Sequence, residues 1–120
     1  SESKEPWLQK YVDYRVEWIG ERPLIDRSHL TVRLDVDNRA HGDAGCNNWF
    51  ASYTLEGGKI SFSQPGSTMK SCAPSLMEQE VRFLEALKKV ERWDYSETGQ
   101  LRLWPAEGEP IKLWKEERRP

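Results

Sequence analysis

Apolar and polar side chains alternate along several short stretches of the chain, which is the pattern of a β-strand with one buried face. In the clearest stretch the apolar positions are Leu30, Val32, Leu34 and Val36, with polar residues between them. A second stretch alternates in the same way, and its apolar positions are Val12, Tyr14, Val16 and Trp18. Both stretches predict strands of an antiparallel sheet that is solvated on one side only.

More strands are expected in the rest of the chain. The segments "NWFASYTL" and "KISFS" flank Glu56-Gly57-Gly58, which is a good hairpin turn signal. Three later strands are expected in "RWDYS", "QLRLW" and "IKLWK", with turns at 96–99 and 105–110 between them. Their alternating inward positions include Leu101, Leu103, Ile111 and Leu113. An earlier turn is expected at 20–23.

The apolar period changes from two to about 3.6 between Pro74 and Val90, which predicts one long helix. Pro74 suits the first turn, where the missing N–H costs nothing. The apolar face comprises Leu76, Met77, Val81, Phe83, Leu84, Leu87 and Val90. We expect Phe83, Leu84 and Leu87 to be buried against the sheet. Glu78 and Glu80 interact favourably with the helix dipole near its start. Strands, one helix and more strands predict an α+β fold.

Composition narrows the possible classes of protein. A length of 120 residues argues for one domain, and 32% charged residues make it a polar one. Six Trp, four Tyr and three Phe supply the large buried side chains that such a core needs. The net charge is −2 and no basic stripe runs along the chain, which argues against nucleic acid as a partner. No apolar run approaches the roughly 20 residues that span a bilayer, so we expect membrane contact only through an anchor outside this chain.

Cys46 and Cys72, which both lie beside turn-forming residues, are the two cysteines of the chain. A catalytic thiol would need a base, for which His29 and His41 are the candidates, and both are expected to be surface residues. A zinc site would need four ligands in a recognisable spacing, which these residues do not supply. A disulfide would stabilise a small polar domain by roughly 3.5 kcal/mol, so the sequence favours one. Two buried thiols in a reducing compartment stay the alternative. We predict no catalytic residue, metal or cofactor.

The loop around the first cysteine, "GDAGCNNWF", has two open interpretations. Asn47 and Asn48 can hydrogen-bond local backbone, and Trp49 can fill the core or its rim. Alternatively, a crosslinked loop is rigid and binds a partner with little loss of entropy. In that case Trp49 is the apolar anchor, and Asn47 and Asn48 give direction.

Several motifs together resemble the META domain family, which includes the HslJ-type heat-inducible lipoproteins. They are "RAHGDAGCNNWFASYTLEGGKISF", "STMKSCAPSLMEQEVRFLEAL", "LRLW" and "IKLW". The residues that match the family pattern are Gly42, Gly45, Cys46, Asn47, Tyr53, Thr68, Met69, Cys72, Glu78 and Glu80. Two residues, Lys70 and Ser71, separate Met69 from Cys72 where the family usually has one. This insertion puts the register of Cys72 relative to the helix in doubt.

The resemblance implies a curled, half-barrel-like antiparallel sheet with the helix packed against it. We expect a domain over residues 14–115, a polar extension or linker over 1–13 and a charged tail over 116–120. The resemblance also implies a bacterial envelope location, in the periplasm or as an outer-membrane lipoprotein that faces it. The expected function is a non-catalytic, partner-binding accessory module with a role in stress. The alternative is a carrier that holds an apolar ligand between sheet and helix, and a hydrolase-like enzyme is the least favoured.

Overall fold

The computed structural model describes residues 8–116, which form ten strands, one α-helix and one 3₁₀ turn. The elements are β1 (Asp13–Ile19), β2 (Arg22–Pro23), β3 (Thr31–Asp35), η1 (Val36–Asn38), β4 (Arg39–Asp43), β5 (Asn48–Glu56), β6 (Lys59–Phe62), β7 (Gly66–Ser67), α1 (Pro74–Lys88), β8 (Val90–Tyr95), β9 (Leu101–Pro105) and β10 (Ile111–Lys115). The predicted order of strands, helix and strands is confirmed. The hairpin turn between β5 and β6 lies where its glycines predict it, with Gly57 at φ 60°.

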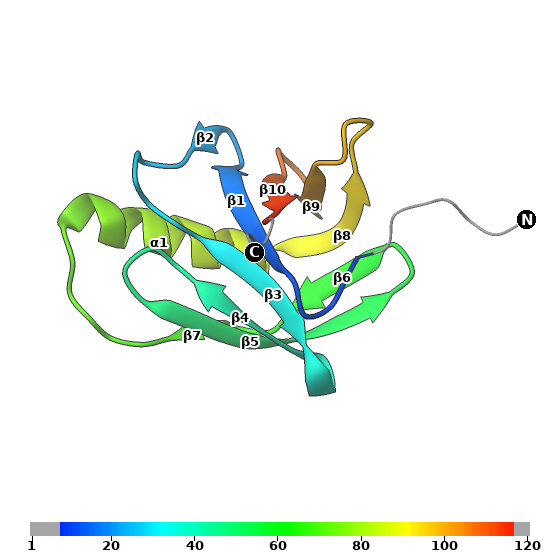
Figure 1. Cartoon of the computed structure of the whole chain (residues 1–120), viewed down its shortest axis with the longest axis horizontal. Helices are drawn as coiled ribbons and strands as arrows, with labels where there is room; N and C mark the ends of the chain where they lie inside the picture. Colours follow the sequence, from blue (N-terminus) through cyan, green and yellow to red (C-terminus); the bar gives the residue numbers. More distant parts are fainter. Residues whose placement is uncertain (1–7, 117–120) are drawn as a thin grey trace, which may run out of the picture.

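The predicted curl of the sheet is confirmed, and it continues until the sheet closes. The antiparallel ring runs β1-β3-β4-β5-β6-β8-β9-β10 and returns to β1 (Figure 1). The closing pairs run from Tyr14↔Lys115 to Ile19↔Ile111. The expected half-barrel is therefore a closed eight-strand barrel, with β2 and β7 as short additions beside β1 and β5. Closure removes free strand edges, which are sites of unwanted pairing.

Helix α1 lies across one end of the barrel (Figure 1). It contacts both β1 and β6, which are on opposite sides of the ring. Phe83 and Leu87 are fully buried beneath it, and the Phe83 ring meets Trp49 edge-to-face with centroids 6.0 Å apart. Leu84 is half-buried and packs on the rim of the core. The predicted packing of the helix against the sheet is confirmed.

The barrel interior is filled by the inward positions of the strands. On the later strands these are the predicted residues, Leu101, Leu103, Ile111 and Leu113, all of them buried. From the early strands come Tyr14, Val16, Leu30, Val32 and Leu34. These inward side chains form one hydrophobic core inside the barrel.

Three sequence-based expectations about burial were wrong. Trp18 is 37% exposed while Ile19 is buried, because the β1–β10 register shifts between Val16 and Trp18 and turns Trp18 outward. Val36 is exposed because β3 ends at Asp35 and the chain enters a 3₁₀ turn. Val81 is 59% exposed, because it lies on the side of α1 that borders an open groove and not on the side that faces the core.

The predicted extension and tail lie partly outside the described residues, which leave out 1–7 and 117–120. Within the described part, Leu8 and Val12 pack against the core, and the backbone N–H of Gln9 donates to the Tyr14 hydroxyl. The last residues of the predicted extension therefore touch the barrel. The domain boundaries themselves stay a prediction.

Candidate functional site

The two cysteines form a disulfide, as the sequence favours, with their Cα atoms 6.0 Å apart. It joins the loop between β4 and β5 to the segment before α1. The two residues that separate Met69 from Cys72 do not prevent the pairing. With both sulfurs bonded, neither is a thiol nucleophile or a thiolate ligand.

Asn47, beside the disulfide, is the centre of a buried polar network. Its backbone N–H and its side-chain amide both donate to the Glu80 carboxylate, at 3.0 and 2.9 Å. The Asn47 side-chain oxygen accepts from the Thr68 hydroxyl at 2.9 Å and from the Lys70 backbone N–H at 2.7 Å. Asn47 is 3% exposed and Glu80 is 5% exposed. This network fastens the loop to the helix and complements the disulfide.

The predicted partner-binding loop presents one of its three residues to solvent. Trp49 is fully buried, and its indole N–H donates to the Thr31 carbonyl at 2.9 Å. Asn47 is buried in the network, whereas Asn48 is exposed. A partner would therefore touch Asn48 and the backbone around it. The binding role of the loop stays a prediction.

Gly42 shows why this loop region needs a glycine. A Cβ atom at Gly42 would collide with the backbone carbonyl of Thr31. That carbonyl accepts the indole N–H of Trp49, which lies opposite Gly42 in the β4–β5 pair. The close approach of backbone and indole accounts for the glycine without a ligand.

Both histidines lie on the surface as predicted, and each faces carboxylates that their sequence spacing did not reveal. The ring nitrogens of His29 lie 3.1 Å from Asp43 and 3.3 Å from Glu116. His41 lies 3.0 Å from Asp35, and this contact is the largest cause that lowers the Asp35 pKa. No serine, threonine or thiol hydrogen-bonds to either ring among the described residues. These pairs therefore do not form a nucleophile–base arrangement.

Tryptophans and cations gather on the outer side of β1, β8, β9 and β10. Because Leu101, Leu103, Ile111 and Leu113 face the core, the residues between them face outward. We call this surface the tryptophan face, and its members are Trp18, Arg92, Arg102, Trp104, Lys112 and Trp114. The sequence does not reveal it, because its members come from both ends of the chain and the β1–β10 closure brings them together.

Cations surround Trp104 on this face. The guanidinium carbons of Arg92 and Arg102 lie 4.8 and 5.3 Å from the centre of its ring. Its indole N–H donates to Asp94 at 2.9 Å, and Arg102 donates two hydrogen bonds to the same carboxylate, at 2.8 and 2.9 Å. Partial burial raises the pKa of Asp94, but the hydrogen bonds from Arg102 and Trp104 outweigh it and lower that pKa below its usual value.

The other two tryptophans are also fixed by neighbours on adjacent strands. The indole N–H of Trp114 donates to Glu17 at 2.7 Å, and the side-chain amide of Gln100 donates to the same oxygen at 3.4 Å. The Lys112 ammonium lies 5.5 Å from the centre of the Trp18 ring. All three rings are thus held in place by side chains of the domain itself.

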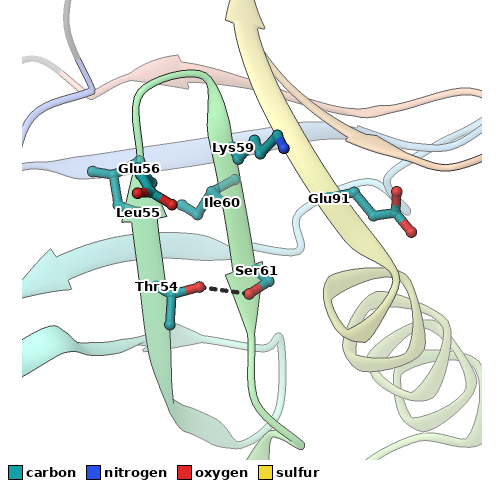
Figure 2. Close-up of a pocket in the computed structure, with 7 residues that line it drawn as sticks. All are labelled: Thr54, Leu55, Glu56, Lys59, Ile60, Ser61 and Glu91. Carbon is teal, nitrogen blue, oxygen red and sulfur yellow. Dashed lines mark hydrogen bonds between the residues drawn. The ribbon is translucent and has the colours of Figure 1, made fainter.

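One groove lies along the edge of β8 that faces away from β9, between β8 and the β5–β6 hairpin. It encloses about 490 Å³ and is lined by Thr54, Leu55, Glu56, Lys59, Ile60, Ser61 and Glu91. Figure 2 shows Lys59 reaching toward β8, and the Thr54 and Ser61 hydroxyls bonded to each other at 2.7 Å. Neither histidine lines this groove, and the Thr54 and Ser61 hydroxyls bond to each other. Lys59 lies opposite Arg92 in the register of β6 and β8, so the groove borders the tryptophan face.

A second groove, of about 360 Å³, lies between α1 and the ends of β1, β9 and β10. Its walls include the apolar side chains Ile19, Val81, Ala86, Leu103, Pro105 and Ile111. Arg82 lines it too, and the Nε atom of Arg82 is buried without a hydrogen-bond partner among the described residues. This is the place between sheet and helix where the sequence analysis expects a carried ligand.

In residues 8–116, no group of three or more His, Cys, Asp or Glu side chains is placed to hold a metal ion. The helix of this part is too short and too polar to cross a membrane.

Comparisons with known proteins agree with this fold. The family model of the META domain matches residues 8–118. An NMR structure of a protein from Burkholderia xenovorans is similar over 98% of this chain and 96% of that chain, with a TM-score of 0.77 and 23% sequence identity. A second NMR structure is similar over 88% of this chain and 89% of that chain, with a TM-score of 0.66 and 20% identity. At these identities the likeness shows the fold alone. No curated protein sequence gives a significant match.

Proposed function

The chain belongs to the META domain family, and from that premise we propose that it is a small, non-catalytic accessory module of the bacterial cell envelope that works by binding a partner. The observation that carries this proposal is the tryptophan face. It offers three fixed indole rings on the outside of the barrel, and none of them belongs to the core cluster. Tryptophan and arginine are the residue types most enriched at the energetic centre of protein interfaces.

The disulfide supports the envelope location. Disulfides form and persist in oxidising compartments such as the periplasm, and they are rare in the bacterial cytosol. Cys46 and Cys72 are bonded in a domain that has no other crosslink in its described part. The resemblance to heat-inducible lipoproteins extends the proposal to a role under stress.

The non-catalytic part of the proposal rests on the chemistry that the fold brings together. The META domain is not a known family of enzymes. Both sulfurs are bonded, and the ring nitrogens of His29 and His41 face carboxylates on the open surface. A catalytic site needs a nucleophile or metal, a base within reach and a stabiliser of developing charge.

The test is capture of partners from envelope extract by the purified domain. Trp18→Ala is the test variant, and Phe50→Ala is its matched control, because Phe50 is an exposed aromatic residue on β5, which lies opposite β10 in the ring. We expect Trp18→Ala to lose a partner that the parent and Phe50→Ala both retain. Equal capture by all three folded proteins would overturn the proposed binding face.

The compartment is tested in living cells. A thiol-blocking reagent should leave Cys46 and Cys72 unmodified in protein expressed from its own gene in its own host, because both are bonded. Complete modification of both cysteines would contradict the envelope location.

The groove beneath α1 supports a second candidate, a carrier of a small apolar molecule. Its volume lies within the range of ligand pockets, and the unpaired Arg82 donor would favour a ligand with a hydrogen-bond acceptor. Decanol is a suitable probe, followed by the NMR signals of the Val81 and Ala86 methyl groups. Ala86→Phe should fill the groove and abolish binding. Decanol that shifts no methyl signal of this groove would remove the candidate.

A further inference from the structure

We propose that the partner of the tryptophan face is a protein that presents an acidic segment to it. This inference rests on the proposed function and specifies the chemical character of the partner.

The charge of the face is opposite to that of the chain. The chain carries a net charge of −2, yet three of the six members of the face are cations. Arg15, opposite Trp114 in the β1–β10 pair, adds a fourth. These four cations outnumber the two acids within the face, Glu17 and Asp94, and the bordering acids Asp13 and Glu116 lie beside Arg33 and His29 instead. A partner with acidic side chains is therefore complementary here, and complementary charge also speeds association.

The acids of the face are already engaged, and the cations are not all satisfied. Asp94 accepts from Arg102 and Trp104, and Glu17 accepts from Trp114 and Gln100. Arg92 and Lys112 contact tryptophan rings but no carboxylate among the described residues. These two side chains are free to pair with carboxylates of a partner. A guanidinium beside an aromatic ring is well suited to this, since it binds carboxylates with two parallel hydrogen bonds.

The hydrogen bonds within the face also argue against a polysaccharide as the partner. A glycan presents many hydroxyl groups, which need hydrogen-bond donors and acceptors on the protein. Here the indole N–H groups of Trp104 and Trp114 and the carboxylates of Asp94 and Glu17 are used within the face. What the face offers is apolar ring surface and positive charge. A partner surface of acidic side chains beside apolar ones is complementary to both.

The geometry suits a protein segment that lies across the strands. One row across four adjacent strands reads Trp18, Lys112, Arg102 and Asp94. Three strand spacings of about 4.8 Å make this row about 14 Å wide. A helix is about 10–12 Å in diameter with its side chains, so one acidic helix would cover the row. Along β9 and β10 each outward cation is followed by an outward tryptophan, and Asp94 ends the row, whereas a nucleic-acid backbone needs a continuous basic track.

The test uses a synthetic peptide in which Asp and Glu alternate with Leu, and a matched peptide with Lys at the acidic positions. The readout is the indole N–H signals of the parent domain in two-dimensional NMR. We expect the acidic peptide to shift the signals of Trp18, Trp104 and Trp114 and to leave buried Trp49 unmoved. The Lys peptide should shift none of them. Salt near 1 M, which shortens the screening length to about 3 Å, should reverse the shifts.

Charge reversal supplies the matched variants. Arg92→Glu with Lys112→Glu leaves the Asp94–Arg102 pair intact and should weaken binding of the acidic peptide at least about tenfold. Arg39→Glu is the control, because Arg39 is exposed on β4, which lies opposite β9 in the ring. It should bind the peptide as the parent does.

Each other outcome overturns the inference. Equal shifts with both peptides would show that charge plays no part, and shifts with a single-stranded oligonucleotide or an anionic glycan alone would give the face a different ligand. The proposed function is judged separately. If the Trp18→Ala variant loses its envelope partner while the charge-reversed variant keeps it, the face binds and only the acidic chemistry is wrong. If both variants keep the partner, both proposals fall.

Discussion

Among single residues, Asn47 connects the most parts of the fold. Its side chain hydrogen-bonds both to the segment before α1 and to the helix itself, and so joins them to the β4–β5 loop. A buried carboxylate such as that of Glu80 is tolerated only where hydrogen bonds replace its water. Asn47 supplies two of those hydrogen bonds. The family motif around Cys46 and the Glu-Gln-Glu segment of the helix thus meet at a structural joint.

Substitution of Asn47 tests this joint. Asn47→Ala leaves Glu80 buried with one donor fewer and also frees the Thr68 and Lys70 groups. We expect the free energy of unfolding in urea to fall by about 2–4 kcal/mol. Exposed Asn48→Ala is the control and should change it by less than about 0.5 kcal/mol. Equally small losses of unfolding free energy at both positions would mean that the network does not stabilise the fold.

Asp94 gives a prediction about acid. Its pKa is lowered in the folded state, so it stabilises the fold above its unfolded pKa, and this stabilisation is lost as the pH falls through the folded value. Asp94→Asn should therefore be less stable than the parent at neutral pH, and the difference should vanish once the pH falls below the folded pKa of Asp94. Urea unfolding across this range measures it. A difference that stays constant with pH would show that the carboxylate charge is irrelevant.

At the scale of the element, α1 presents two chemically different sides to the barrel end. Phe83 and Leu87 are apolar and fully buried. Gln79 is also fully buried, and it accepts from the Ile25 backbone N–H and donates to the Ser28 hydroxyl. The helix is therefore positioned by directional bonds near its start and by packing near its end.

A pair of alanine substitutions tests which face of the helix supports the fold. Phe83→Ala removes a ring that contacts Trp49 and should cost about 3–5 kcal/mol through lost burial and a cavity. Val81→Ala is the matched control on the exposed side and should change the free energy of unfolding by less than about 0.5 kcal/mol. The measurement is the urea midpoint of each variant. A large loss from Val81→Ala would mean that the groove side of the helix is packed after all.

Local patterns predict the elements well, because they depend on neighbours in sequence. Alternation gives the strands, Gly57 and Gly58 give the hairpin turn, and Pro74 gives the helix start. The bulge that turns Trp18 outward is not visible in that pattern, because it depends on pairing with β10. The buried position of Glu80 is also missed, since an acid in the first turns of a helix reads as solvent-exposed. Only the partner, Asn47, makes its burial tolerable.

The candidate site was harder to predict for the same reason. The sequence analysis points to Asn47, Asn48 and Trp49, which are adjacent in the chain and rich in polar and aromatic groups. In the structure, Asn47 and Trp49 are buried and stabilise the fold. The tryptophan face is assembled from strands at the two ends of the chain, so no local motif announces it. The six tryptophans in a polar chain were the one available signal.

At the scale of the whole molecule, the disulfide and the barrel share the task of holding the shape. The disulfide closes a loop between residues 26 apart in sequence. Cys46→Ser with Cys72→Ser should lower the free energy of unfolding by about 3.5 kcal/mol, mainly by freeing the unfolded chain. Reductant added to the parent should have the same effect. Thermal unfolding with and without reductant would show it, and a parent that is indifferent to reductant would contradict it.

The closing pair of β1 with β10 has a consequence for synthesis of the protein. The ribosome delivers β1 early and β10 last, so until Ile111–Lys115 is released one edge of β1 has no neighbour. An open edge is a template for joining another chain. A nascent domain is therefore exposed to aggregation until β10 has left the ribosome. A chain stopped before Ile111 should aggregate rather than form a smaller barrel, which light scattering of the truncated protein would reveal.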